Sequence, residues 1–315
     1  MISITTSTMA SMTMTENHTN TAKTLIVIAG PTASGKTELA IKLAQTLDTE
    51  IVSADSRQFY AEMNIGTAKP DYDELNAAKH HFIGHLSVND RYDVSRYETD
   101  AISLLNKLFE IHDNVILCGG SGLYIDAVTK GIDNLPDPDV EVRNKLKQLY
   151  ENEGIDALRK KLLDVDPEFY EIVDINNPIR MIRAIEVFYT VGEKFSTLRK
   201  GTAKQRNFSV KQFVIDVPRN QLVEKINKRV DIMMDKGLLN EVKSLLEYKS
   251  LTALNTVGYK ELFAYLDNAC SLDFAIEKIK TNTRRYAKRQ VTWFKRDDDY
   301  VWLPASEIFN RCISL

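Results

Sequence analysis

An eight-residue stretch near the start of the chain carries the residue types that bind phosphate groups. It reads Gly30-Pro31-Thr32-Ala33-Ser34-Gly35-Lys36-Thr37 and fits the pattern G-x-x-x-x-G-K-[ST]. In such a loop the backbone N–H groups converge on phosphate oxygens, and the following helix N-terminus adds partial positive charge. Lys36 is placed to reach a terminal phosphate and Thr37 to ligate Mg²⁺. The pattern predicts a bound diphosphate or triphosphate without identifying the molecule that carries it.

The residues around this loop predict the elements that position it. The run TLIVIA, residues 24–29, is short and apolar, as expected of a buried parallel strand. After the loop, Leu39, Leu43 and Leu47 recur at helical spacing. The sequence therefore predicts a strand, then the phosphate loop, then a helix that begins at the end of the loop.

A second apolar run, residues 50–55, reads EIVSAD and ends on the carboxylate of Asp55. In open α/β sheets the carboxyl ends of the strands form the ligand crevice, so Asp55 is expected near the phosphate loop. Ser56, Arg57 and Gln58 follow on an exposed turn. From spacing alone, Asp55 is equally a helix N-cap, and both interpretations stay open.

A third strand, NVILC over residues 114–118, runs into Gly119-Gly120-Ser121-Gly122. Repeated strand–glycine–helix units predict a parallel, doubly wound sheet. The glycines could serve the turn alone, but their place at the switch-point edge favours a role facing the substrate.

The composition and the hydrophobic pattern of the sequence change after Leu135. Residues 136–204 are charged and helical in pattern, and we expect them to form a helical insertion in an α/β core made of residues 23–135 and 205–315. Asn177-Pro178 begins a helix that carries Arg180 and Arg183 on one face. A strand at 212–217 follows, and the C-terminal region is mostly helical. We expect residues 1–22, rich in Ser, Thr and Met, to be a disordered tail.

The segment 278–296, KIKTNTRRYAKRQVTWFKR, is basic and contains no acidic residue. Tyr286, Trp293 and Phe294 are interleaved with the cations. Basic residues suit phosphate backbones and aromatic rings suit stacked bases, so we interpret the segment as a nucleic-acid surface. A solvated basic face, or arginines that close over the ligand phosphates, is the alternative.

Composition limits the remaining possibilities. The net charge is −3, so a nucleic-acid surface must be a local patch. Three cysteines, far apart and without a CxxC pair, argue against a disulfide framework or a zinc site and suit a reducing cytoplasm. No apolar run is long enough for a membrane span.

Seven motifs in order, between about Thr24 and Trp302, resemble the tRNA dimethylallyltransferase family, also called tRNA isopentenyltransferases. They read GPTASGKT, SADSRQFY, MNIGTAKP, CGGSGLY, NPIRMIRAIEV, VGYKEL and NTRRYAKRQVTWFKRD. The resemblance implies an α/β fold, with a P-loop, nucleoside-kinase-like parallel sheet. It also implies that a dimethylallyl group passes from dimethylallyl diphosphate to N6 of the adenosine 3′ of a tRNA anticodon, in a cytoplasmic enzyme that we expect to be a monomer.

The resemblance also assigns roles to residues. Residues 30–37 would bind the donor, with Thr32, Lys36 and Arg229 stabilising the leaving diphosphate and Thr37 ligating Mg²⁺. Asp55 would be the catalytic base. Ser121, where the family usually has Thr, would contact the tRNA. The full set of tRNA contacts implied by the resemblance is Asp55, Ser56, Arg57, Gln58, Ser121, Arg143, Ile179, Arg180, Met181, Ile182 and Arg183.

Three other functions are compatible with parts of this pattern. A small-molecule P-loop kinase would share the loop and Mg²⁺ but bind ATP. A related prenyltransferase would modify free AMP or ADP. A non-catalytic RNA-binding NTPase would not need Asp55. The basic segment and the insertion with Arg180 and Arg183 favour a tRNA substrate over these alternatives.

Overall fold

The computed structural model describes residues 23–314, so the predicted tail at 1–22 lies outside the described part. Its centre is a six-stranded sheet in the order β3-β2-β4-β1-β5-β6, and every neighbouring pair is parallel. This confirms the predicted parallel α/β core. The strands are β1 Thr24–Ala29, β2 Ile51–Ser53, β3 His80–His81, β4 Asn114–Gly119, β5 Ser209–Ile215 and β6 Tyr300–Leu303.

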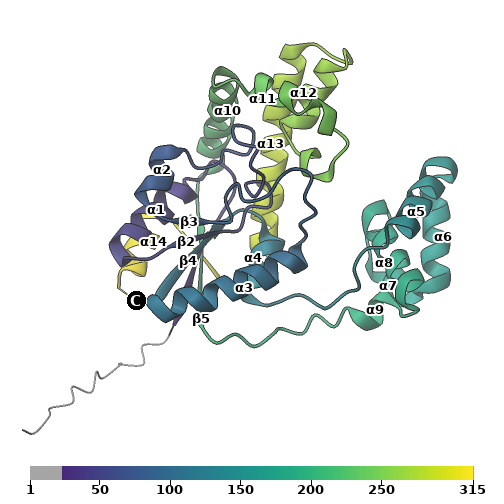
Figure 1. Ribbon diagram of the computed structural model, residues 1–315, viewed down its shortest axis with the longest axis horizontal. Helices are drawn as coiled ribbons and strands as arrows, with labels where there is room; N and C mark the ends of the chain where they lie inside the picture. The colour runs from purple at the N-terminus through teal and green to yellow at the C-terminus, as the bar shows by residue number, and fades with distance from the viewer. Residues whose placement is uncertain (1–22, 315) are drawn as a thin grey trace, which may run out of the picture.

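Alternation along β1 explains why helices cover both faces of the sheet (Figure 1). Leu25 and Val27 pack into one apolar cluster with α3 and α4, whereas Ile26 and Ile28 pack into another with α1 and α14. Successive side chains of a strand point to opposite faces, so a continuous apolar run needs cover on both sides. The covering helices are α1 Lys36–Leu47, α3 Val94–Ile111, α4 Gly122–Thr129 and α14 Ala305–Cys312.

Between β4 and β5 the chain leaves the sheet and forms a separate helical bundle (Figure 1). Its core contains Leu158, Leu162, Met181 and Ile185, and two extended connections join it to the sheet. The bundle has its own apolar core because the helices bury leucine and isoleucine stripes against one another. The helices are α5 Val140–Glu153, α6 Ile155–Val165, α7 Pro167–Ile172, α8 Pro178–Val191 and α9 Phe195–Leu198.

The C-terminal region is helical and packs beside the sheet (Figure 1). Gly237 adopts φ 96° between two helices of this region, so one helix ends there before the next begins. Within 23–314, no helix has both the length and the apolar composition needed to cross a membrane. The remaining elements are α2 Tyr72–Ala77, α10 Arg219–Asp235, α11 Leu238–Ser244, η1 Leu246–Tyr248, η2 Thr252–Leu254, α12 Tyr259–Leu266 and α13 Leu272–Phe294.

We predict that Asp166→Asn destabilises the helical bundle. The Asp166 carboxylate is 0% exposed and accepts hydrogen bonds from the Phe169 N–H, the Ser196 N–H and the Ser196 hydroxyl. An amide directs N–H groups at these donors, so we expect the free energy of unfolding to fall by about 1–3 kcal/mol. Chemical denaturation measures it, with the exposed Asp164→Asn as control. Equal stability of the two variants would contradict this role.

Candidate active site

Parallel pairing brings the predicted site segments to one edge of the sheet. Ala29 of β1 is in register with Gly119 of β4, and Ser53 of β2 with Cys118 of β4. The phosphate loop, the turn at Asp55 and the glycine turn each follow one of these residues. They therefore meet at the carboxyl ends of β1, β2 and β4, as the sequence predicts.

The phosphate loop has the backbone shape of an anion cradle. Gly30 and Gly35 have φ of 149° and 91°, and Ala33, which is not a glycine, has φ of 66°. The Ser34 hydroxyl is buried and has no hydrogen-bond partner among the described residues. A buried polar atom without a partner is rare, and a phosphate oxygen is a fitting partner for a hydroxyl in this loop. The loop thus fits a phosphate group on its own geometry.

The amine of Lys36 turns back into the loop, where it donates a hydrogen bond of 2.8 Å to the Pro31 carbonyl. The pKa of Lys36 is lowered to about 8, mainly by burial and to a smaller degree by nearby Arg229, while Cys118 and Asp55 act in the opposite direction. Desolvation disfavours a charged amine, so an anion in the loop would restore its proton affinity. Binding of a phosphate ligand is therefore expected to raise the pKa of Lys36.

Arg229 reaches the loop from α10, and its Nη1 donates to the Thr32 hydroxyl at 3.2 Å. Burial lowers the pKa of Arg229, partly offset by Glu74 and Asp55. The structure thereby brings together Thr32, Lys36 and Arg229, the three residues assigned to the leaving group. Within the described residues Arg229 forms no ion pair, so its guanidinium is not bound by a carboxylate.

Gln290 is a site residue that the sequence interpretation missed. Its side chain is 6% exposed; its oxygen accepts the Thr32 N–H at 2.9 Å, and its Nε2 donates to the Gly120 carbonyl at 2.9 Å. It therefore joins the phosphate loop to the glycine turn. Helical spacing was the available signal, because Ala287, Gln290 and Phe294 share the buried face of α13.

Asp55 lies half-buried just beyond β2 in a turn, and no helix begins there. One carboxylate oxygen, Oδ1, accepts the Arg57 N–H at 3.0 Å. The other, Oδ2, has no hydrogen bond within residues 23–314. Of the two interpretations left open, the helix N-cap is wrong, and Asp55 keeps an oxygen available for a ligand.

Ser121 links the Asp55 turn to the glycine turn. Its hydroxyl accepts the Ser56 N–H at 3.1 Å and lies 3.3 Å from the Ser56 hydroxyl. Tyr286 of α13 lies close by, and burial, with the negative charge of Asp55 adding to it, raises the pKa of Tyr286 to about 12. The tyrosine therefore stays neutral and can act as a hydrogen-bond donor beside Asp55.

The side chains of Arg57 and Gln58 are held by neighbouring loops. Arg57 donates to the Thr252 carbonyl at 3.1 Å, and Gln58 Nε2 donates to the carbonyls of Thr67 and Ala68 at 3.3 and 3.0 Å. Their orientation is thus set before any ligand binds.

The glycines of the third motif serve close packing. A Cβ on Gly119 would lie 2.3 Å from the Ala54 carbonyl oxygen, and one on Gly122 would lie 2.2 Å from the Trp293 ring. A Cβ on Gly120 would lie 2.3 Å from Nε2 of Gln290. The glycines are needed for the close approach of Ala54 and α13, and the substrate-facing role expected of this turn stays a prediction.

The predicted contacts in the insertion lie apart from this edge (Figure 1). Arg143 and Arg183 each donate to one oxygen of Glu186 at 2.8 Å, and that carboxylate is 0% exposed. Met181 is fully buried and Ile182 is 8% exposed, so their side chains face the bundle core.

Two neighbouring insertion residues do reach the surface. Ile179 is 77% exposed and Arg180 is also exposed. The structure therefore leaves Arg180 and the outer parts of Arg143 and Arg183 accessible for a phosphate backbone.

Helix α13 divides the basic segment into two faces. Arg285, Lys288 and Arg289 are exposed on one side. On the other, Phe294 is 0% exposed in the sheet core, and the Trp293 Nε1–H donates to Asp126 at 3.1 Å. The interpretation of Phe294 as a stacking surface is therefore wrong, because helical periodicity directs it inward. The cations remain a basic face.

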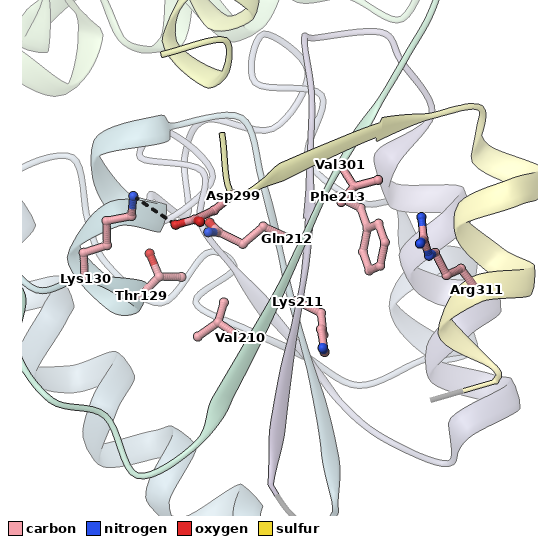
Figure 2. A pocket seen from close by; sticks show the side chains of 9 residues that line it. All are labelled: Thr129, Lys130, Val210, Lys211, Gln212, Phe213, Asp299, Val301 and Arg311. Carbon is pink, nitrogen blue, oxygen red and sulfur yellow. Dashed lines mark ion pairs between the residues drawn. The ribbon is translucent and has the colours of Figure 1, made fainter. Parts of the chain in front are cut away.

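A cavity of the sheet lies away from these residues. Figure 2 shows it around the first half of β5, with Lys130 paired to Asp299 at 3.7 Å. Its volume is about 520 Å³. None of the predicted site residues lines it. The lining residues are Thr129, Lys130, Val210, Lys211, Gln212, Phe213, Asp299, Val301 and Arg311.

Comparison with known proteins gives a consistent result. The IPP transferase family model matches residues 58–297. A tRNA dimethylallyltransferase 1 of Bacteroides thetaiotaomicron is 49% identical over 279 residues, 89% of this chain and 91% of its own. A tRNA dimethylallyltransferase of Christiangramia forsetii is 50% identical over 283 residues, 90% of this chain and 94% of its own.

Solved structures agree. The tRNA isopentenylpyrophosphate transferase of Bacillus halodurans aligns with a TM-score of 0.67 at 33% identity, covering 92% of this chain and 94% of its own. A eukaryotic dimethylallyltransferase acting on tRNA aligns with a TM-score of 0.74 at 28% identity, covering 90% of this chain and 74% of its own. From the matched length, the identities and the shared fold, the chain belongs to the IPP transferase family.

Proposed function

We propose that this protein transfers the dimethylallyl group of dimethylallyl diphosphate to N6 of the adenosine 3′-adjacent to the anticodon in tRNA. The observation that carries the proposal is the meeting of a phosphate cradle and an available carboxylate at one sheet edge. Lys36 and Arg229 lie on the cradle side, and Asp55 lies on the facing turn. Such a pairing suits a reaction in which an anion leaves while an amine loses a proton.

On the donor side, the need is charge neutralisation as the allylic C–O bond breaks. The loop N–H groups, the amine of Lys36 and the guanidinium of Arg229 would receive the negative charge that develops on the diphosphate. Arg229 also donates a hydrogen bond to the Thr32 hydroxyl, so the guanidinium and the hydroxyl lie next to each other at the loop. The donor's carbon fragment would lie toward Asp55, where the acceptor enters.

Thr37 would hold Mg²⁺ together with oxygens of the diphosphate. The ion takes oxygen ligands and usually keeps several waters, so a single hydroxyl beside a diphosphate fits it. Within residues 23–314 the Thr37 hydroxyl has no hydrogen bond, and no group of three or more His, Cys, Asp or Glu side chains forms a metal cage. When bound, Mg²⁺ supplies Lewis-acid neutralisation of the leaving group.

On the acceptor side, the adenine amine is a weak nucleophile because its lone pair is delocalised into the ring. As the N–C bond forms, the nitrogen becomes positive, and the available Asp55 oxygen would accept its proton. The base has to leave its stack to reach this carboxylate. Ser121 and Tyr286, beside Asp55, would contact the extruded nucleotide.

The tRNA would be bound at two places. The basic face of α13 is on the same helix as Tyr286, whose pKa is raised in part by the negative charge of Asp55. The insertion adds Arg180 with Arg143 and Arg183. Phosphate contacts of this kind position an RNA without reading its sequence. We further infer a cytoplasmic enzyme that acts as a monomer, which size-exclusion chromatography tests.

The direct experiment supplies purified protein with unmodified tRNA, Mg²⁺ and labelled dimethylallyl diphosphate. We expect label on the adenosine next to the anticodon. Label on free AMP instead of tRNA would identify a nucleotide prenyltransferase. Tight ATP binding without binding of dimethylallyl diphosphate would identify a kinase-like protein.

We predict that Asp55→Asn lowers the rate of transfer by about 10²–10⁴-fold because the amide cannot accept the proton. The tRNA dissociation constant should change little, since shape and hydrogen-bonding reach are kept. Single-turnover transfer and filter binding measure the two quantities. Asp73→Asn, an exposed aspartate on α2, is the matched control. A wild-type rate in Asp55→Asn would overturn the assignment.

We predict that the affinity for dimethylallyl diphosphate falls as pH rises through about 8. Burial lowers the pKa of Lys36 to about 8 in the free protein, and a bound diphosphate raises it, so binding is coupled to protonation of the amine. Above this pH the proton must be taken up from solution. Calorimetric titration across pH 7–10 measures this dependence. Lys36→Arg should bind without the decline, because a guanidinium keeps its proton.

We predict that Lys288→Ala weakens tRNA binding and lowers its salt dependence. Loss of one phosphate contact should reduce the slope of log K against log salt by about 0.7–0.9. Lys243→Ala, an exposed lysine on α11, is the control. An unchanged slope in Lys288→Ala would show that this face of α13 does not touch the RNA backbone.

A further inference from the structure

The Glu241 carboxylate of α11 is enclosed by hydrogen-bond donors from a distant loop. Its Oε2 accepts the N–H groups of Asn64 and Ile65 at 2.9 and 2.7 Å. Its Oε1 accepts the Gly66 N–H at 3.0 Å and the Tyr259 hydroxyl at 2.6 Å. Three successive backbone N–H groups around one anion form a nest, which orients the loop as a unit.

Tyr259 adds a steric constraint to the same loop. Its ring lies so close to Gly66 that a Cβ there would be 2.5 Å from the ring. Tyr259 itself is 0% exposed in the apolar cluster of the C-terminal helices. The loop that begins at Asn64 therefore packs against the buried Tyr259 ring. Charge-assisted hydrogen bonds, which are stronger than those between neutral groups, hold it there.

The residues that follow carry this constraint to the Asp55 turn. The carbonyls of Thr67 and Ala68 accept the two hydrogen bonds that Gln58 Nε2 donates. The Gln58 N–H in turn donates to the Asp55 carbonyl at 3.2 Å. Hydrogen bonds joined by short stretches of covalent chain thus link Glu241 to the backbone of Asp55.

Lys69 closes the loop on its other side. Its Nζ donates to the Tyr60 carbonyl at 2.7 Å and to the Asn64 side chain at 2.8 Å. Burial lowers the pKa of Lys69, while Glu241 and Glu62 raise it. The negative charge of Glu241 therefore also supports the cation that ties the loop to the segment after Gln58.

We propose that Glu241 is a positioning residue for the transfer reaction, acting through the loop 64–69 to set the turn that carries Asp55. It touches neither substrate, and its effect on the reaction rests on the function proposed above for Asp55. The carboxylate is required rather than any polar group, because it accepts four donors while donating none.

The test is Glu241→Gln in the full-length protein. The amide keeps the volume but turns an N–H₂ group toward backbone donors, so the loop shifts. We expect kcat with tRNA to fall about 10- to 100-fold, as a displacement near 1 Å at a catalytic group does. The dissociation constant for dimethylallyl diphosphate should stay within about twofold, because no hydrogen bond between described residues joins the phosphate loop to the loop 64–69. Glu224→Gln, an exposed glutamate on α10, is the control.

Tyr259→Phe provides a second, milder variant. It removes one of the four donors and keeps the ring against Gly66, so we expect a smaller loss of kcat and an unchanged fold by circular dichroism. A purely structural role of Glu241 predicts a lower melting temperature with wild-type kcat per folded molecule, and that result would overturn the proposal. Absence of transfer in the wild-type protein would instead refute the proposed function.

Discussion

Parallel pairing of β1 and β2 with β4 is the constraint on which the site depends. The Cys118 carbonyl accepts a hydrogen bond from the Ala54 N–H at 2.8 Å, and the Ala54 carbonyl accepts one from the Ser121 N–H at 3.3 Å. The ends of β2 and β4 are therefore joined one residue before Asp55. The glycine turn allows this approach because a Cβ on Gly119 would collide with the Ala54 carbonyl. The phosphate loop follows β1 at the same edge. Cradle and carboxylate face each other because three strands end together.

The electrostatics of this edge suit the binding of an anion. Lys36 and Arg229 are placed together, and burial lowers the pKa of each. Two neighbouring cations in a partly desolvated loop are unfavourable alone and become favourable when a diphosphate is bound. The charge of Asp55 raises the pKa of both cations, yet its carboxylate forms no hydrogen bond with either of them. It accepts one from the Arg57 N–H instead. This separation of charges suits a leaving anion on one side and a departing proton on the other.

The helices added to the sheet have different relations to the site. Helix α13 is part of its construction, because Gln290 joins the phosphate loop to the glycine turn. Helix α11 contributes Glu241, whose carboxylate is enclosed by the loop 64–69 rather than by the site itself. The bundle stands apart, and its buried Glu186 fixes Arg143 and Arg183 at the cost of part of their hydrogen-bonding capacity. Burying that carboxylate requires both partners, so the two arginines are oriented together.

The sequence by itself determined the phosphate loop, the parallel core and the helical insertion, because apolar period and glycine spacing are local properties of the chain. The strand at 24–29 was predicted with its observed limits. Only the tertiary structure decided which polar residues were enclosed: Gln290 within a basic run, Glu241 against a loop some 175 residues away, and Glu186 between two arginines. It also placed Phe294 in the core. Those outcomes depend on which helix face meets which partner, and that is set by packing between segments distant in sequence.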